Sequence, residues 1–166
     1  MIQVIDNFIS DYHIKSLYES LKLPSTDWYV GKDSSSSKLK NNSFVKAVDP
    51  NLVYNYHILY EIFCRIKNQN IVNTNNLFQI YFNCVKPGDR FDYHVDQNGT
   101  SVLIYCNPVW KFWWGSGTEF KNPRKIVRPK PGRLIAFDGQ IKHRCISPNL
   151  FMNDFGRLSV VFQFQK

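Results

Sequence analysis

Long apolar runs are missing from this sequence, and its opening lacks the pattern of a secretory signal. No apolar stretch approaches the roughly 18 residues that a membrane-spanning helix needs. The first residues, Met1–Phe8, contain no basic region followed by an apolar one. We therefore expect a cytoplasmic protein that has no membrane partner.

Cysteine is scarce and widely spaced. The four cysteines, Cys64, Cys84, Cys106 and Cys145, form no Cys-x-x-Cys pair. This scatter favours buried free thiols in a reducing compartment over a disulfide framework. A chain of 166 residues is long enough to bury a core without such cross-links. We expect one domain spanning residues 1–166, and a monomer.

Acidic residues are outnumbered by basic ones, which gives a formal net charge of +8. Such a charge can attract nucleic acid or an acidic partner, or it can simply keep a small protein in solution. The basic residues are spread along the chain, and only Arg124, Lys125, Arg128, Lys130 and Arg133 gather locally. The solubility interpretation is favoured, and in either case the positive field would attract a dicarboxylate.

The first half of the chain has helical patterns. Ser10 has the character of an N-cap, and 11–23 and 52–66 repeat apolar residues at steps of three and four. Between them lies the polar, Ser-rich segment 31–43. It is too polar to bury much surface, so we expect a surface loop, with a lid over the substrate as the alternative.

From Leu77 onward short apolar strands alternate with turns, two of which contain Pro-Gly pairs. The expected fold is α+β, with helical support mainly in 10–68 and a jelly-roll core, or double-stranded β-helix, in 77–166. The predicted strands are 77–85, 91–96, 101–107, 118–121, 125–128, 133–138, 142–147 and 157–165.

The pair His94 and Asp96 is the most informative feature of the sequence. On a strand, side chains two residues apart point to the same face. With His143, forty-nine residues after His94, the pair would form the set of two histidines and one carboxylate that holds Fe(II) and leaves coordination positions open. Arg157 then offers a charged fork suited to the carboxylate of an anionic cosubstrate.

Alternation along 157–165 separates a polar face from an apolar one. Arg157, Ser159 and Val161 share one face, and a buried arginine there needs an anionic partner. A bound dicarboxylate would satisfy both Arg157 and the Ser159 hydroxyl. The same reasoning makes Tyr105, Tyr81 and Asn83 candidates for polar groups that line the cavity.

Together these residues resemble the Fe(II)- and 2-oxoglutarate-dependent dioxygenases, and most closely their prolyl 4-hydroxylase-like branch. The match preserves order and spacing over essentially the whole chain. The family's usual double glycine is here interrupted as Gly115-Ser116-Gly117. The segments that carry the resemblance are Val4–Phe8, Tyr93–Asp96, Leu103–Trp110, Trp114–Phe120, Pro131–Phe137, His143 and Arg157–Ser159.

The resemblance implies that His94, Asp96 and His143 bind Fe(II), and that Arg157 and Tyr105 contact the distal carboxylate of 2-oxoglutarate. The resemblance also assigns Ser159, Tyr81 and Asn83 to the 2-oxoglutarate pocket, but less strongly. O₂ is the second cosubstrate, and ascorbate is an accessory that the family allows. The reaction implied is hydroxylation of an unactivated C–H bond with release of succinate and CO₂.

The substrate is expected to be a prolyl residue of a peptide or protein, in a groove bordered by 31–43 and by Trp110, Trp113 and Trp114. Core packing is an equal interpretation of these tryptophans. Other hypotheses are hydroxylation of a free amino acid or small metabolite, and a jelly-roll module that binds metal without turnover. A nucleic-acid demethylase like the AlkB family is a further alternative. The pattern of that family has a second arginine six residues after the first. This chain has Gln163 at that position.

Overall fold

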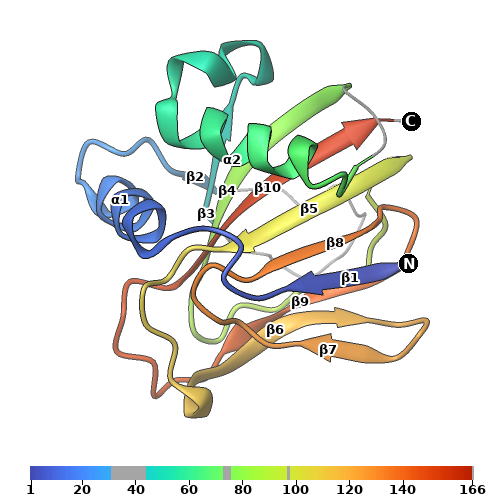
Figure 1. Cartoon of the computed structure of the whole chain (residues 1–166). Coiled ribbons are helices and arrows are strands. Elements are labelled where there is room, and N and C mark those ends of the chain that lie inside the picture. The colour runs from blue at the N-terminus through green and yellow to red at the C-terminus, as the bar shows by residue number, and fades with distance from the viewer. Residues whose placement is uncertain (31–43, 73–75, 97, 166) are drawn as a thin grey trace.

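The computed structural model describes residues 1–30, 44–72, 76–96 and 98–165. These residues form two antiparallel sheets with helices over one of them (Figure 1). The larger sheet has the order β1-β8-β5-β10-β4-β3-β2. Its strands are β1 Ile2–Ile5, β2 Tyr29–Val30, β3 Phe44–Val48, β4 Leu77–Val85, β5 Gly99–Tyr105, β8 Leu134–Asp138 and β10 Arg157–Gln165. The smaller sheet, in the order β7-β6-β9, contains β6 Gly115–Phe120, β7 Lys125–Val127 and β9 His143–Pro148.

Two α-helices cover the outer face of the larger sheet, as Figure 1 shows. Helix α1 spans Asp11–Lys22, and the Ser10 side chain accepts a hydrogen bond from the His13 backbone N–H, as its predicted N-cap role requires. The second helical segment is divided. A 3₁₀ helix, η1 Pro50–Asn55, precedes α2 His57–Asn68, and a further 3₁₀ turn, η2 Phe112–Trp114, lies before β6.

The expected helix 52–66 was therefore wrong at its start. Asp49 caps the 3₁₀ helix through the Asn51 backbone N–H, and Pro50 occupies its first turn. Leu52 and Tyr56, taken as part of the apolar stripe, are 45% and 48% exposed. A capped turn that begins with proline competes with α-helix at this point, so the buried stripe begins only at Leu59.

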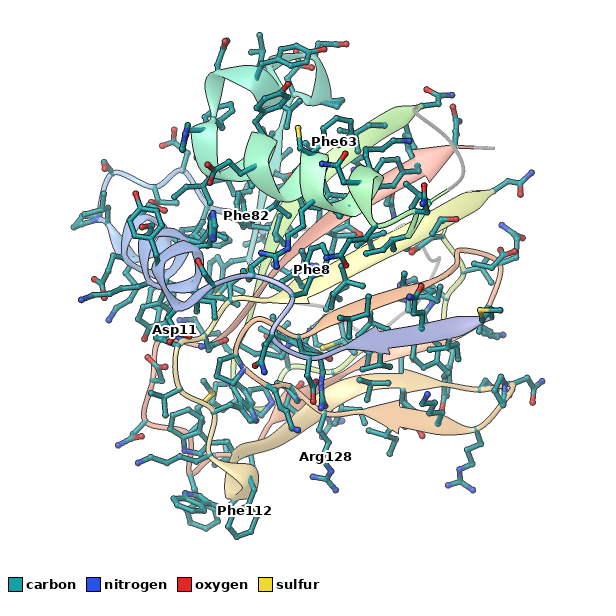
Figure 2. All side chains as sticks on the ribbon, in the orientation of Figure 1. Phe8, Asp11, Phe63, Phe82, Phe112 and Arg128 are labelled. Atoms are coloured by element: carbon teal, nitrogen blue, oxygen red, sulfur yellow. The ribbon has the colours of Figure 1, made fainter. Side chains whose placement is uncertain are left out.

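Strand β10 lies between β5 and β4 and separates two cores. Its residues Leu158, Val160, Phe162 and Phe164 pack with the helices in the larger core. Figure 2 labels Phe8, Phe63 and Phe82 on this helix-covered side. Val161, from the opposite face of β10, belongs to a smaller core between the two sheets, shared with Tyr105, Phe120, Val127, Leu103, Ile135 and Phe137. The predicted alternation of β10 is confirmed, and so is the double-stranded β-helix fold.

Most predicted strands form close to their expected bounds, with one exception. Segment 91–96 is not a strand, because among its residues only His94 forms a bridge, to His143. The sequence analysis also missed β1, β2 and β3, which are short or lie near the sheet edges. The Ser-rich segment 31–43 lies outside the described residues. Within the described chain, no helix is long and apolar enough to cross a membrane.

Candidate metal centre

The side chains of His94, Asp96 and His143 converge at the edge of β9. Their potential ligand atoms all lie within 4.8 Å of one another. Asp96 Oδ1 is 3.8 Å from His94 Nε2, and Asp96 Oδ2 is 3.7 Å from His143 Nε2. Metal–ligand bonds of about 2 Å place two donors on one ion roughly 3 to 4 Å apart. Small side-chain adjustments therefore suffice for the three residues to bind a single ion.

A pair of backbone hydrogen bonds brings the two histidines together. His94 and His143 each donate their N–H to the other's carbonyl oxygen at 2.9 Å. Because 91–96 is not a strand, the predicted alternation alone does not place Asp96 beside His94. Its position is fixed by its own contacts, since its N–H donates to the Gly139 carbonyl at 2.8 Å and its carbonyl accepts from Gln140 Nε2 at 3.1 Å.

Both imidazoles are oriented to present Nε2 to a metal. The Nδ1 atom of His143 lies 2.8 Å from the Ile141 carbonyl, and that of His94 lies 3.2 Å from the Asp92 carbonyl. A carbonyl only accepts, so Nδ1 carries a proton in each ring, which leaves Nε2 as the nitrogen that can bind a metal beside Asp96. The Ser101 hydroxyl donates to Asp96 Oδ2 and restrains the carboxylate. The sequence carried no signal for this role of Ser101.

An apolar wall holds the His143 ring. The Phe137 ring centre lies 4.6 Å from the centre of the imidazole, and that of Phe120 lies 6.0 Å from it. Both phenylalanines are buried in the core between the sheets. A dry wall of this kind strengthens electrostatic interactions in the site and restricts water around a bound metal.

Arg157 and Ser159 lie on the inner face of β10 with hydrogen-bonding capacity left over. Arg157 is 2% exposed and donates from Nη1 to the Gly117 carbonyl at 2.9 Å. Its Nε and the Ser159 Oγ are buried without a hydrogen-bond partner in the described structure. None of the ion pairs of the described residues involves Arg157. A buried cation next to an unsatisfied hydroxyl matches a small anionic ligand.

Cys145 links the two parts of the site. It lies two residues after His143 on β9, which is about 7 Å along a strand. Its thiol contacts the Arg157 guanidinium, while burial raises the pKa of that thiol. A short dicarboxylate would span this separation. The sequence analysis missed Cys145, although its spacing from His143 equals that of Asp96 from His94 and was a usable signal.

Tyr105 lies beside Arg157 and is buried. Its hydroxyl donates to the Val127 carbonyl at 3.1 Å and lies 3.0 Å from Thr118 Oγ1. The Arg157 guanidinium carbon is 5.5 Å from the centre of the Tyr105 ring. Burial raises the pKa of Tyr105, so this phenol stays neutral near pH 7. Thr118 was another residue that the sequence analysis missed.

Tyr81 and Asn83 lie on β4, directly across from the inner face of β10. Tyr81 pairs with Val161, and Asn83 pairs with Ser159. Both side chains are half-buried, and Tyr81 Oη accepts from Gln163 Nε2 at 3.4 Å. The structure thus places both residues on the side of the sheet that contains Arg157, while their contact with a cosubstrate stays a prediction.

The interrupted glycine pair keeps a defined geometry. Ser116 adopts a left-handed backbone conformation with φ 71°, and its hydroxyl donates to the Ile146 carbonyl at 2.6 Å. Gly117 has φ 158°, and a Cβ there would lie 2.8 Å from the Val127 carbonyl oxygen. A side chain at position 117 would therefore disturb the Val127 carbonyl, which accepts the hydrogen bond from Tyr105.

The tryptophans do not border the metal site. They precede Gly115, which pairs with Pro148, whereas His143 pairs with Phe120 at the other end of these strands. Five residues along a strand separate the two ends by about 17 Å. Trp114 is 4% exposed and packs edge-on against Trp110, while Trp113 is 53% exposed. The expected groove beside this loop is corrected accordingly: Trp110 and Trp114 pack against each other, and the neighbouring Phe112 points outward at the tip of the loop (Figure 2).

Comparison with known proteins shows the fold. No family model and no curated protein matches the sequence. A prolyl 4-hydroxylase from Pseudomonas putida is similar in structure, with a TM-score of 0.76 and 15% identity, over 99% of this chain and 92% of that one. The viral collagen prolyl hydroxylase of Paramecium bursaria Chlorella virus 1, in its 2-oxoglutarate complex, has a TM-score of 0.68 at 15% identity and covers 98% and 94%.

A third similar structure is a Trichoplax adhaerens prolyl hydroxylase in complex with a peptide fragment of the hypoxia-inducible factor oxygen degradation domain. Its TM-score is 0.62 at 16% identity, over 99% of this chain and 83% of that one. The chain therefore has the double-stranded β-helix fold found in these prolyl hydroxylases. Because one fold supports many reactions, the function has to be argued from the site itself.

Proposed function

We propose that this protein is an Fe(II)- and 2-oxoglutarate-dependent dioxygenase that hydroxylates a prolyl residue of a peptide or protein. The observation that carries the proposal is the pairing of two features on one inner surface. A set of two histidines and one carboxylate faces a shared point, and a buried arginine with an unsatisfied Nε contacts Cys145, which lies two residues after His143 on β9.

The residues fit Fe(II) and 2-oxoglutarate in charge and in the type of donor atom. His94, Asp96 and His143 offer two neutral nitrogens and one carboxylate, which is the donor set of non-haem Fe(II) oxygenases. Arg157 and Ser159 offer the donors that a carboxylate of 2-oxoglutarate would accept. When bound, iron and 2-oxoglutarate supply the oxidising chemistry, with succinate and CO₂ as by-products.

The chain's own contribution is binding and orientation. The carbonyls of Asp92 and Ile141 hold the imidazoles in the tautomer that leaves Nε2 free. Phe120 and Phe137 keep water from one side of the site. Arg157 would bind the distal carboxylate, and the neutral Tyr105 phenol lies beside it.

The choice of a peptidyl prolyl substrate is supported by the fold, which the similar prolyl hydroxylases share. One of those structures contains a bound peptide fragment. Proline-rich segments also bind with a small loss of conformational entropy, because their extended shape is preformed. The alternative of nucleic-acid demethylation gains no support at position 163, where a buried glutamine contacts Tyr81.

Succinate formation tests the proposal directly. The full-length protein with Fe(II), 2-oxoglutarate and O₂ is incubated with proline-rich peptides, free amino acids and methylated oligonucleotides in separate reactions. We expect stimulation by the peptides and a gain of 16 mass units on proline, with His143→Ala as the inactive control. Demethylation of the oligonucleotides without change to the peptides would overturn the prolyl assignment, and no succinate in any reaction would overturn the dioxygenase assignment.

A further inference from the structure

Three side chains meet on the outer face of the smaller sheet, directly behind the metal ligands. Arg144 on β9 donates from Nε to Glu119 Oε2 on β6 at 2.7 Å. The guanidinium carbon of Arg144 also lies 4.6 Å from the centre of the Tyr93 ring. We call Tyr93, Arg144 and Glu119 the clasp. It joins the segment before His94 to both strands of this part of the sheet.

Each member of the clasp is the sequence neighbour of a residue in the metal site. Tyr93 precedes His94, and Arg144 follows His143. Glu119 precedes Phe120, the residue that pairs with His143 and packs against its ring. Neighbouring residues on a strand face opposite sides, so Arg144 and Glu119 face away from His143 and Phe120, and Tyr93 joins them through its contact with Arg144. The clasp and the metal site are therefore two faces of the same short piece of sheet.

The clasp is built more strongly than an ordinary surface ion pair. The Glu119 side chain is only 8% exposed, and that of Arg144 is 40% exposed. The hydrogen bond from Arg144, joined by one from the Tyr93 hydroxyl, lowers the pKa of Glu119. A partly desolvated, charge-assisted contact of this kind is stronger than an exposed one, and leaving the carboxylate unpaired would be costly.

The segment that carries His94 needs such support, because it is not a strand. Only the reciprocal hydrogen bonds between His94 and His143 connect its backbone to β9 at the metal site. Beyond the bridge Asp96 is held by Gly139, but on the other side of it no backbone hydrogen bond among the described residues holds Tyr93, so the tilt of the segment there is loosely defined. Stacking of Tyr93 on Arg144 restrains that tilt, and with it the direction of the His94 imidazole.

We infer that the clasp is a positioning device, which holds His94 at the separation from His143 that lets both bind one metal ion. The inference rests on the proposed function only for the existence of the metal site. It concerns binding geometry rather than chemistry, so metal affinity can test it without any substrate.

The test measures Co(II) binding, by its visible absorption, to the metal-free full-length protein. Arg144→Met removes the guanidinium, and the double variant Arg144→Met with Glu119→Gln also removes the carboxylate that would be left unpaired. We expect both to bind Co(II) about 10-fold more weakly, the scale for losing a group that orients metal ligands. Tyr93→Leu should behave similarly, whereas Tyr93→Phe, which keeps the ring, should bind within about twofold of wild type.

Hydrogen exchange of the metal-free protein provides a readout independent of metal. The backbone amides of His94 and His143 should exchange faster in the double variant, while those of β10 should not change. The matched control is Glu61→Gln, which removes the His13–Glu61 ion pair on the helix-covered side. This control should leave Co(II) affinity and the two amides unchanged.

Wild-type Co(II) affinity in the double variant and in Tyr93→Leu would overturn the inference, even if succinate formation by the wild type upholds the proposed function. Conversely, weakened Co(II) binding in these variants would uphold the inference even if the wild type forms no succinate. General loss of folding is recognised by the thermal midpoint. If the metal-free double variant lost Co(II) affinity only together with a lower midpoint and faster exchange in β10, the clasp would be an ordinary stabilising contact and the inference would be overturned.

Discussion

The two faces of strand β10 differ in how completely their side chains are satisfied. On the helix-covered face, Leu158, Val160 and Phe162 are fully buried among apolar neighbours. On the opposite face, Arg157 and Ser159 are as deeply buried but retain unpartnered polar atoms. The first arrangement maximises stability, whereas the second sacrifices stability for a site that a ligand can complete. One strand thus serves the fold on one side and binding on the other.

The largest expected effect comes from removing a metal ligand on the binding side. His143→Ala should abolish turnover and metal binding, because the remaining two donors no longer form a facial set. His94→Ala and Asp96→Ala should do the same. Succinate formation and Co(II) titration measure the two effects. Thermal unfolding of the metal-free variants should show a folded domain, and retained metal affinity in any of the three would contradict the site assignment.

Phe162→Ala probes the helix-covered face. This side chain is fully buried, so its truncation should lower the free energy of unfolding by about 3–5 kcal/mol. Denaturant unfolding measures the loss. Co(II) affinity, measured where the variant is still folded, should stay at the wild-type level. A drop in metal affinity matching the loss of stability would show that the two faces are not separable.

Arg157→Lys tests the buried cation of the binding face. Lysine keeps the charge but cannot donate the two parallel hydrogen bonds of a guanidinium. We therefore expect 2-oxoglutarate to bind roughly ten- to a hundred-fold more weakly, equivalent to about 1.5–3 kcal/mol. Calorimetry on the Co(II)-loaded protein gives the dissociation constant, with Co(II) affinity itself as the internal control. Unchanged 2-oxoglutarate binding in Arg157→Ala would refute the assigned role.

The smallest effect is expected at a surface cluster of three charges, Asp6 with Arg133 and Lys130. Their hydrogen bonds, Arg133 first, lower the pKa of Asp6 from 3.8 to about 2. A lowered pKa in the folded state stabilises the protein above the unfolded value and loses this contribution as pH falls from about 4 to about 2. Because Asp6 is largely exposed, we expect less than about 1 kcal/mol.

Unfolding free energies of the wild type and Asp6→Asn, compared from pH 6 to pH 2, measure this contribution. The difference between the two proteins should shrink toward zero at the acid end. A difference that grows as the pH falls would mean that the Asp6 pairing does not stabilise the fold. Asp6 lies at the surface, where water screens its charge, whereas Arg157 is buried. Comparing the two variants therefore shows how burial changes the effect of a charge.

The strands that could be predicted from the sequence are those with clear alternation or a continuous apolar run between turns. In β10 the alternation even separated the two faces correctly. The prediction of strands failed where a contact between residues far apart in the chain, rather than a local pattern, decides whether a strand forms. Segment 91–96 alternates like a strand but pairs only at His94, and edge strand β1 forms because it docks on β8.

The sequence by itself determined which donors are present and which of them can share a face. An imidazole and a carboxylate two residues apart, a second imidazole and an arginine on an alternating strand are local facts. Tertiary structure alone decided that His94 and His143 bond to each other through their backbones, and that no carboxylate among the described residues pairs with Arg157. It also decided that the tryptophan loop lies at the far end of β6 and β9. Distances between residues far apart in the chain depend on sheet register and on the packing of whole layers, and no local pattern encodes these.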